Sequence, residues 1–328
     1  MPTVHYLNVK QGDCSMIKHR SGRISVLDVC SARIEAPLIA ALKSIRLKEA
    51  EKGIHGNFNQ KEYPVNPIEY MKERGLTSVF RFILTGPDMD HMDGIKDFFS
   101  ALAPANFWDT DNNAKKDFPA GAPYRFEDWQ FYKSVRDSNP QAHPKRLALL
   151  SGAKGSHYNQ DENGQGGGDG LHVLAPTADL LRLGNECGEH NDCSYVILYK
   201  TGGYSVVFAG DSHDNTWEHV LNAHQDVREI DLLIAPHHGR GSDRSYDFLD
   251  VLKPKLTFFG NAPSEHLAYG AWDYRGLRKV TNNQAGCMIV DFADKMRLYV
   301  THKPFAEQVN RYTFYSESLK AWYCDDID

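Results

Sequence analysis

The sequence predicts an α/β protein with strand-rich segments in both halves of the chain. Two patterns indicate this fold class: short runs of alternating or wholly apolar residues, and intervening segments whose apolar residues follow a helical period. Of the 328 residues, 41% are hydrophobic and 24% are charged, which is ordinary for a globular protein with a sizeable core. The net charge of −6 gives no overall field that would attract nucleic acid or an anionic membrane.

The first half of the chain is expected to begin with an antiparallel group of strands and to continue with helices. Alternating residues and short turns predict three strands, at 4–9, 15–18 and 24–29. Helical spacing or helix-forming composition predicts three helices, at 36–50, 67–75 and 91–104. A buried strand is predicted at 78–85, ending at Gly86-Pro87, and 51–66 is expected to be a loop. Residues 108–170 are the least regular part, and their Gly-rich end is interpreted as a flexible loop.

The second half repeats this order, with strands first and strand–loop–helix units later. Strands are predicted at 171–174, 194–199, 204–209, 231–235, 255–259, 287–292 and 296–300. Helices are predicted at 214–226 and 246–252, and Lys200-Thr201-Gly202-Gly203 is typical of a hairpin turn. The two halves therefore look alike, with acidic and His residues at strand ends in both.

The chain carries no pattern of export or membrane insertion. Its first residues lack a basic segment followed by an apolar run, and no stretch approaches about 18 consecutive apolar residues, so we expect a cytoplasmic protein without a membrane partner. The six cysteines are scattered and are expected to be reduced. Cys187, His190 and Cys193 could form part of a zinc site, but no fourth ligand is evident and coincidence is the favoured interpretation.

Potential metal ligands follow three of the apolar strands. Asp88, Asp90 and His91 follow the strand at 78–85, Asp211 follows 204–209, and the pair His237–His238 follows 231–235. Carboxylate and imidazole ligands together suit zinc, manganese or iron. Each group alone has an ordinary explanation, such as helix capping, a turn or a structural His. Their recurrence at three strand ends favours a shared metal site.

These motifs resemble the metallo-β-lactamase superfamily and, within it, the hydrolase domain of ComEC-type competence proteins. The clearest matches to the family patterns occur in the family's order, at 8–13 (NVKQGD), 26–29 (VLDV), 84–94 (LTGPDMDHMDG), 190–194 (HNDCS), 208–211 (FAGD) and 233–239 (LIAPHHG). Gly260-Asn261 with His266, and Thr281 through Gly286, look like degraded forms of two further motifs. The resemblance covers about two thirds of the chain.

The resemblance implies a four-layer αβ/βα sandwich with two mixed β-sheets and a site at one edge between them. Under this interpretation residues 1–328 form a single metallo-β-lactamase-like domain. Residues 34–75 and 108–170 would be insertions, and 301–328 a C-terminal extension.

The resemblance also implies roles for the candidate ligands. Asp90 and His91 would bind at the second metal position, and Asp211 would bridge two metals or bind one. His237 or His238 would complete that position, with His237 favoured because it directly follows the strand. Asp88 would stand where many relatives carry the second His of H-x-H-x-D-H. The first His of that motif is Gly86 here, so the first position would keep Asp88, Asp211 and a residue of 190–192, and would bind its metal weakly or only with substrate.

The expected activity is hydrolysis assisted by one or two divalent cations, Zn or Mn. Asp88 or Asp90 could orient a water or take its proton, and His213 or His266 could donate a proton to the leaving group, although a packing or surface role is the ordinary alternative for each His. The likeness to ComEC-type domains favours a phosphodiester in nucleic acid or a nucleotide. Five basic residues near the motifs could contact phosphate or form a solvated face: Arg240, Arg244, Arg275, Arg278 and Lys279.

Two other functions fit the same sequence. One is hydrolysis of a small ester, lactam or thioester, although no residue marks such a substrate. The other is a degenerate binding or regulatory subunit, in which Gly86 marks a decayed site and the insertions contact a protein partner.

Overall fold

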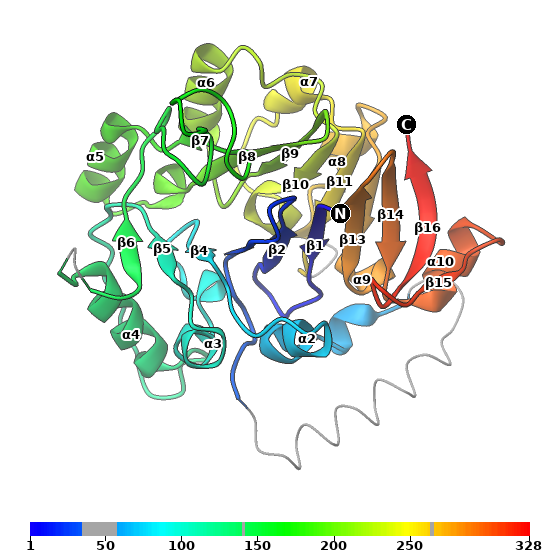
Figure 1. The fold of residues 1–328 in the computed structure, drawn as a ribbon. Helices are drawn as coiled ribbons and strands as arrows, with labels where there is room; N and C mark the ends of the chain where they lie inside the picture. The colour runs from blue at the N-terminus through cyan, green and yellow to red at the C-terminus, as the bar shows by residue number, and fades with distance from the viewer. Residues whose placement is uncertain (35–57, 140–141, 263–265) are drawn as a thin grey trace.

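The computed structural model describes residues 1–34, 58–139, 142–262 and 266–328. Two mixed β-sheets pack face to face, and helices cover the outer face of each (Figure 1). The larger sheet has ten strands and the smaller has six within these ranges. The four-layer αβ/βα sandwich expected from the sequence is therefore confirmed.

The larger sheet combines both ends of the chain. In sequence order its strands are β1 (Thr3–Tyr6), β2 (Ser15–Lys18), β3 (Ile24–Leu27), β4 (Arg81–Ile83), β5 (Asn106–Trp108), β6 (Lys145–Leu147), β13 (Met288–Phe292), β14 (Met296–Val300), β15 (Tyr315–Ser316) and β16 (Ala321–Ile327). They lie in the order β15-β16-β14-β13-β1-β2-β3-β4-β5-β6. Pairing is parallel from β3 to β6 and antiparallel elsewhere.

The smaller sheet repeats the pattern of the first six strands. Its strands are β7 (Leu171–Ala175), β8 (Val196–Thr201), β9 (Tyr204–Phe208), β10 (Leu232–Ile234), β11 (Leu256–Phe259) and β12 (Lys279–Thr281). They lie in sequence order, with β7 to β9 antiparallel and β9 to β12 parallel. The carboxyl ends of β9, β10 and β11 therefore meet at one edge, as those of β3, β4 and β5 do in the larger sheet.

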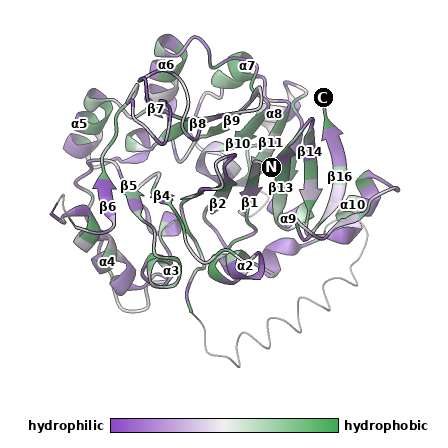
Figure 2. Ribbon diagram, viewed as in Figure 1, coloured by the Kyte–Doolittle hydropathy of each residue, from purple (hydrophilic) through white to green (hydrophobic). Residues whose placement is uncertain are grey.

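Three apolar clusters hold the layers together. One lies between the sheets, and it includes Val4 from the larger sheet and Phe208 from the smaller. The second joins the larger sheet to α2 (Pro67–Glu73), α3 (Ile95–Leu102) and α4 (Phe126–Arg136), and the third joins the smaller sheet to α6 (Asp214–Ala223), α7 (Phe248–Leu252) and α8 (Tyr269–Asp273). Figure 2 shows hydrophobic strands inside and a hydrophilic β6 at the sheet edge, as expected when only inner strands are buried on both faces.

The remaining helices are short or peripheral. They are α5 (Ala178–Cys187), α9 (Asn282–Ala285), α10 (Lys303–Val309) and the 3-10 turns η1 (Gln60–Glu62), η2 (Met89–His91), η3 (Asn191–Cys193) and η4 (Pro236–Gly239). The turns η2 and η4 directly follow the fourth strand of each half and carry the candidate ligands.

Several expected elements differ from the structure. The predicted helix at 36–50 lies outside the described residues. Residues 301–328, expected as a C-terminal extension, contribute to the larger sheet, because β16 pairs with β14 along most of its length. Residues 108–170 are more regular than expected, since they contain α4 and β6, and the Gly-rich loop ends at Asp169, which Arg23 and Arg81 bind through ion pairs.

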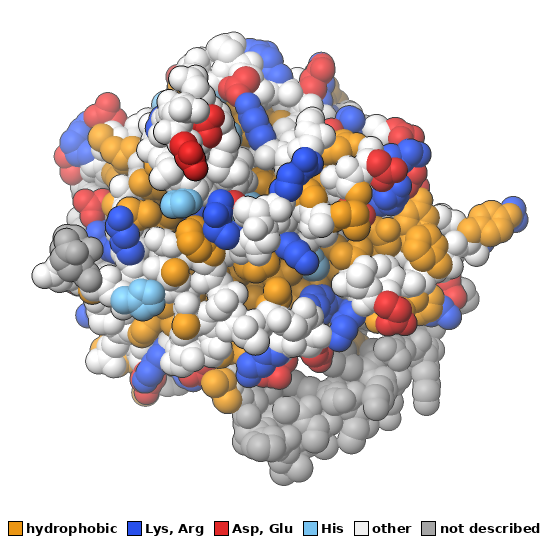
Figure 3. Space-filling view, in the orientation of Figure 1, with side chains coloured by type: hydrophobic (Ala, Val, Ile, Leu, Met, Phe, Trp, Pro, Cys, Tyr) orange, Lys and Arg blue, Asp and Glu red, His pale blue; other side chains and the backbone are white. Residues whose placement is uncertain are grey.

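The described helices include none that is both long and apolar enough to cross a membrane. Acidic and basic side chains are interspersed over the face in Figure 3, and hydrophobic side chains gather over the C-terminal segment near α10 and β15. Tyr312 and Phe314 are among the exposed large hydrophobic residues of that segment.

Candidate metal centre

Two buried imidazoles and two carboxylates converge at the edge where the parallel strands of both sheets end. His91 and Asp90 lie in η2 after β4, Asp211 follows β9, and His238 lies in η4 after β10. His91 Nε2 is 3.1 Å from Asp211 Oδ2, and His238 Nε2 is 3.2 Å from Asp90 Oδ2. One ligand atom from each of Asp90, His91 and His238 lies within 4.8 Å of the other two. The two closest pairs, His91 with Asp211 and Asp90 with His238, join residues 120 and 148 positions apart in the sequence.

The backbone of η4 determines which histidine points inward. His237 and His238 both have left-handed φ angles, of 52° and 60°, and Gly239 follows at 84°. A Cβ at Gly239 would overlap the Phe259 ring, so only glycine fits there. Two consecutive non-glycine residues in this region are costly, and such strain concentrates at functional sites.

Each buried imidazole contacts a carboxylate through Nδ1, the nitrogen that faces away from the cluster. His91 Nδ1 is 2.9 Å from Asp28 Oδ2, and Asp28 also accepts a hydrogen bond of 2.7 Å from the backbone N–H of Thr85. His238 Nδ1 is 3.0 Å from Asp13 Oδ1, and the hydroxyl of Tyr6 donates to that same carboxylate. Carboxylates in this position fix the ring orientation of metal-binding histidines and raise their basicity.

Asp13 and Asp28 were not among the residues predicted for the site. Both lay within the motifs NVKQGD and VLDV, so an acid near a strand end was the available signal. Their partners lie 225 and 63 positions away, and only the folded chain pairs them.

The charges of the cluster stabilise one another. Burial alone would lower the pKa of His91, but Asp211 and Asp28 raise it well above its ordinary value. Burial likewise opposes the charged form of His238, and Asp13 and Asp211 raise its pKa. Burial would raise the pKa of Asp211, whereas the neighbouring His91 and His238 hold it far below the ordinary range. Cation binding would therefore compete with protons for these imidazoles.

The donor set fits a divalent cation. His91 Nε2 and Asp211 Oδ1 are buried and make no hydrogen bond within the described part of the chain, although such atoms almost always have a partner. Both belong to the cluster, where a cation would satisfy them. Imidazole nitrogen with carboxylate oxygen suits zinc, manganese or iron. Asp90, His91, Asp211 and His238 would hold the ion.

His237 is oriented differently from its neighbour. Its Nε2 is 4.0 Å from Asp211 Oδ2, and its Nδ1 accepts a hydrogen bond of 3.2 Å from the Arg244 guanidinium. Burial, together with the charges of His238 and Arg244, lowers the pKa of His237 to about 4. The geometry thus favours His238 as the ligand, and the expected preference for His237 because it directly follows the strand is revised.

Asp88 stands apart from the cluster. Its carboxylate is 37% exposed and forms an ion pair with Lys116. Gly86 is buried beside it, and a Cβ there would have Ser194 Oγ at 3.5 Å as its nearest neighbour. Within the 190–192 segment, His190 Nε2 lies 3.3 Å from Asn113 Oδ1, and Asp192 accepts hydrogen bonds from Thr216 at the start of α6. The described contacts therefore assemble no second ligand group around Asp88.

The predicted proton donors lie outside the cluster. His213 is half-buried and precedes α6, and His266 is exposed, with its backbone carbonyl accepting from Gly241. Among the hydrogen bonds and ion pairs of the described residues, none joins either imidazole to the cluster.

Most of the basic residues that were expected to contact phosphate already form ion pairs with acidic side chains. Arg275 pairs with Asp250, Arg278 with Asp325, and Lys279 with Asp273. Arg244 is buried and donates to the backbone carbonyls of Ser212 and Asp211, so it supports the site from inside. Arg240 is half-buried at the end of η4.

Comparison with known proteins gives a local sequence match and distant structural ones. No family profile matches the chain. ComE operon protein 3 of Bacillus subtilis (strain 168) is 29% identical over 87 residues, which are 26% of this chain and about a tenth of that protein's length. The isothiocyanate hydrolase from Delia radicum gut bacteria aligns over 88% of this chain and 99% of its own, with 13% identity and a TM-score of 0.46. The metallo-β-lactamase SMB-1 aligns over 71% and 76%, with 14% identity and a TM-score of 0.36.

Proposed function

We propose that the chain is a metal-dependent hydrolase of phosphodiesters in nucleic acid or nucleotides, with one firmly held divalent cation. The observation that carries the proposal is the buried cluster of Asp90, His91, Asp211 and His238, in which His91 Nε2 and Asp211 Oδ1 have no hydrogen-bond partner among the described residues. The resemblance to ComEC-type hydrolase domains, together with the local match to ComE operon protein 3, supports the phosphodiester as substrate.

The residues of the cluster divide into holding and reacting groups. A divalent cation bound there would lower the pKa of a water and withdraw charge from a phosphoryl oxygen. Asp28 and Asp13 keep the two imidazoles oriented, and Arg244 fixes the loop of η4 by binding the carbonyl of Asp211. Asp90 is 20% exposed at its side chain, so it can reach the solvent side, where it would orient the attacking water and take its proton.

Lys116 lies at the same rim and pairs with Asp88, two residues before Asp90, with its side chain 29% exposed. The ammonium group cancels the charge of the Asp88 carboxylate, so an anionic substrate that approaches Asp90 meets less repulsion there.

A degenerate binding or regulatory subunit is the second candidate. The observation in its favour is the composition of the Gly86–Asp88 segment, where one position has no side chain and the other is neutralised by Lys116. Such a protein would bind a cation or a ligand without hydrolysis.

Metal content and substrate hydrolysis together test the proposal. Protein purified without chelator should contain at least ~0.5 equivalent of Zn or Mn, as expected for such a donor set. It should hydrolyse methyl p-nitrophenyl phosphate and a short oligonucleotide faster than p-nitrophenyl acetate, and Asp90→Asn should abolish this hydrolysis. Protein that binds neither metal refutes the site. Metal binding without phosphodiester hydrolysis refutes the phosphodiesterase and supports the regulatory subunit.

A further inference from the structure

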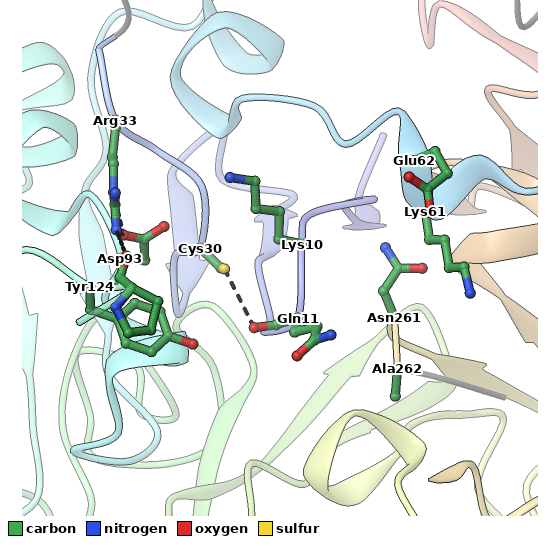
Figure 4. Close-up of a pocket in the computed structure, with 11 residues that line it drawn as sticks. Lys10, Gln11, Cys30, Arg33, Lys61, Glu62, Asp93, Tyr124, Asn261 and Ala262 are labelled. Atoms are coloured by element: carbon green, nitrogen blue, oxygen red, sulfur yellow. Dashed lines mark hydrogen bonds and ion pairs between the residues drawn. The ribbon is translucent and has the colours of Figure 1, made fainter. Parts of the chain in front are cut away.

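A cavity of about 420 Å³ opens beside the metal cluster and has no role in the site described so far. Its wall is assembled from loops at the strand ends of both sheets (Figure 4). The lining side chains central to its chemistry are Lys10, Arg33, Lys61, Asp93, Tyr124 and Asn261. The volume lies in the range of sites that bury small organic ligands.

The cavity and the metal cluster share a wall. Gln11 lines the cavity, and Gly12 next to it packs so closely on the backbone carbonyl of Asp90 that a Cβ would not fit. Asp93 follows His91 by two positions and also lines the cavity. After burial, the charge of Asp90 is the largest cause that raises the pKa of Tyr124, which places the phenol within electrostatic reach of the cluster. A ligand in the cavity would therefore lie next to the reacting group.

Among the described residues, the basic side chains of the wall outnumber the acidic ones. Arg33 and Asp93 form an ion pair of 2.5 Å and cancel each other. Lys10 is exposed and Lys61 is half-buried, and neither ammonium has an ion-pair partner in the part of the chain that the structure describes. Figure 4 shows Lys10 between the group of Arg33, Asp93 and Tyr124 on one side and Asn261 with Lys61 on the other. Two free lysines against Glu62 favour an anionic ligand.

Asn261 offers a buried acceptor in the same wall. Its Nδ2 donates to Asn8 Oδ1 at 2.7 Å and to the carbonyl of Val9 at 2.5 Å. Two acceptors around Nδ2 fix the orientation of the amide, because a flipped group would place an oxygen against them. Oδ1 is then buried and has no hydrogen-bond partner within residues 1–34, 58–139, 142–262 and 266–328. It can accept from an N–H or O–H of a ligand.

Tyr124 completes the wall with an aromatic surface. The residue precedes α4, is half-buried, and lines the cavity from the side of the 108–170 segment. Exposed aromatic rings of this kind stack on nucleobases, which is worth about 1–3 kcal/mol per base and tolerates any base. The wall thus combines two separate ammonium groups, a hydrogen-bond acceptor and an aromatic ring.

We propose that this cavity is the subsite for a nucleotide unit that flanks the scissile phosphodiester. Lys10 and Lys61 bind the phosphate of that unit, Tyr124 stacks on its base, and Asn261 Oδ1 accepts from a sugar hydroxyl or a base amino group. The position of the subsite relative to a scissile bond rests on the proposed function, whereas nucleotide binding in the cavity does not.

The test measures binding and hydrolysis separately. Adenosine monophosphate binding is followed by calorimetry on the metal-loaded protein, with inorganic phosphate as the comparison ligand. Lys10→Met and Lys61→Met should each weaken adenosine monophosphate binding roughly tenfold, the loss expected for one charge-assisted hydrogen bond. Tyr124→Ala should weaken it by a similar factor. Lys18→Met, at the exposed end of β2, is the matched control and should leave binding unchanged.

Hydrolysis then places the subsite next to the reaction. The cavity variants should raise KM for a 5′-phosphorylated dinucleotide by a larger factor than KM for methyl p-nitrophenyl phosphate, because the latter substrate has neither a base nor a second phosphate. Unchanged adenosine monophosphate binding in the Lys10→Met/Lys61→Met double variant would overturn the proposal, as would phosphate binding as tightly as the nucleotide. Nucleotide binding that the variants weaken, in a protein that hydrolyses no phosphodiester, would support the cavity and reject the proposed function.

Discussion

The segments β1–β6 and β7–β12 have the same strand order and pairing, yet they equip equivalent strand ends differently. After the third strand stand Asp28 in the first half and Asp211 in the second. After the fourth strand stand Asp90-His91 and His237-His238. The carboxyl edges of parallel strands meet in each sheet, so the two halves face each other across the site with these residues.

The third-strand carboxylates show how equivalent positions have diverged. Asp28 is fully engaged, since it binds Thr85 and the Nδ1 of His91, and it supports a ligand from behind. Asp211 instead faces the ligand nitrogens and leaves Oδ1 without a hydrogen-bond partner. The same backbone position thus supports the site in one half and contacts the cation in the other.

The fourth-strand pairs differ in the first residue and agree in the second. His91 and His238 both point Nε2 into the cluster, and their supporting carboxylates, Asp28 and Asp13, both come from the first half. The second half therefore contributes ligands, while the first contributes ligands and supports. Variants at equivalent positions can test this division.

The largest effect on metal affinity is expected from replacing the carboxylates that follow the third strand of each half with amides. Asp211→Asn removes a charged ligand at the centre of the cluster and should lower metal affinity by more than about 100-fold and abolish hydrolysis. Asp28→Asn removes only a support and should cost about 10–100-fold in metal affinity. Chelator competition measures the metal affinity of each variant, and circular dichroism confirms that each variant is folded. Equal losses would show that the two carboxylates have not diverged in role.

The next largest effect on metal affinity is expected from substituting the adjacent histidines of η4. His238→Gln should weaken metal binding about 100-fold, because its Nε2 faces Asp90 and its Nδ1 is supported by Asp13. His237→Gln should change metal affinity by less than about tenfold, since Arg244 already occupies Nδ1 and Nε2 lies at the margin of the cluster. Zinc titration of both metal-free variants measures the two affinities and shows which histidine binds the metal. A greater loss in His237→Gln would restore His237 as the ligand.

The chemistry of the strand ends could be predicted from the sequence, since apolar runs that stop at Asp and His residues mark both the end of a strand and a donor set. The four-layer arrangement was implied by the resemblance to the metallo-β-lactamase superfamily, not by the strand and helix patterns. The inward-facing histidine of η4 could not be predicted, because it depends on two left-handed φ angles that no residue preference reveals. The supports Asp13 and Asp28 and the Asp88–Lys116 pair depend on contacts between distant segments.

Some of the short strands also could not be predicted from the sequence. The strands β5, β6 and β12 have three residues each and, unlike the equally short β4 and β10, do not lie within a longer apolar run that would mark them, so only their pairing in the sheets defines them. The cavity wall was missed for a similar reason. Lys10 lies within NVKQGD but was not considered as a ligand, and Lys61 lies outside every motif, whereas the basic residues considered for phosphate mostly pair with surface acids.

A moderate effect is expected where the halves meet at Gly86. A side chain fits there, because the nearest atom to a Cβ is Ser194 Oγ at 3.5 Å and φ lies outside the left-handed region. Gly86→His alone should keep one tightly bound metal, since Lys116 neutralises Asp88. Gly86→His/Lys116→Met should raise the tight stoichiometry toward two, with Gly86→Ala as the steric control. Elemental analysis after dialysis measures the count, and two tight metals in the wild type would contradict the weakened first position.

The smallest effect concerns stability at the fifth strand ends, where Asp109 follows β5 and Asn261 follows β11. Burial raises the pKa of Asp109 to about 7, although Arg146 and Tyr132 oppose the shift. Between about pH 4 and pH 7 the folded chain keeps this proton and the unfolded chain does not, so the free energy of unfolding falls as pH rises and levels off above pH 7. Asp109→Asn, which mimics the amide of the other half, removes this dependence. Its stability relative to the wild type should therefore increase by about 2 kcal/mol between pH 5 and pH 8 in urea unfolding. Asp111→Asn is the matched control for loss of a carboxylate beside Arg146, because Asp111 binds the same guanidinium but its side chain is exposed. A pH-independent difference for Asp109→Asn would show that this carboxyl ionises normally in the folded protein.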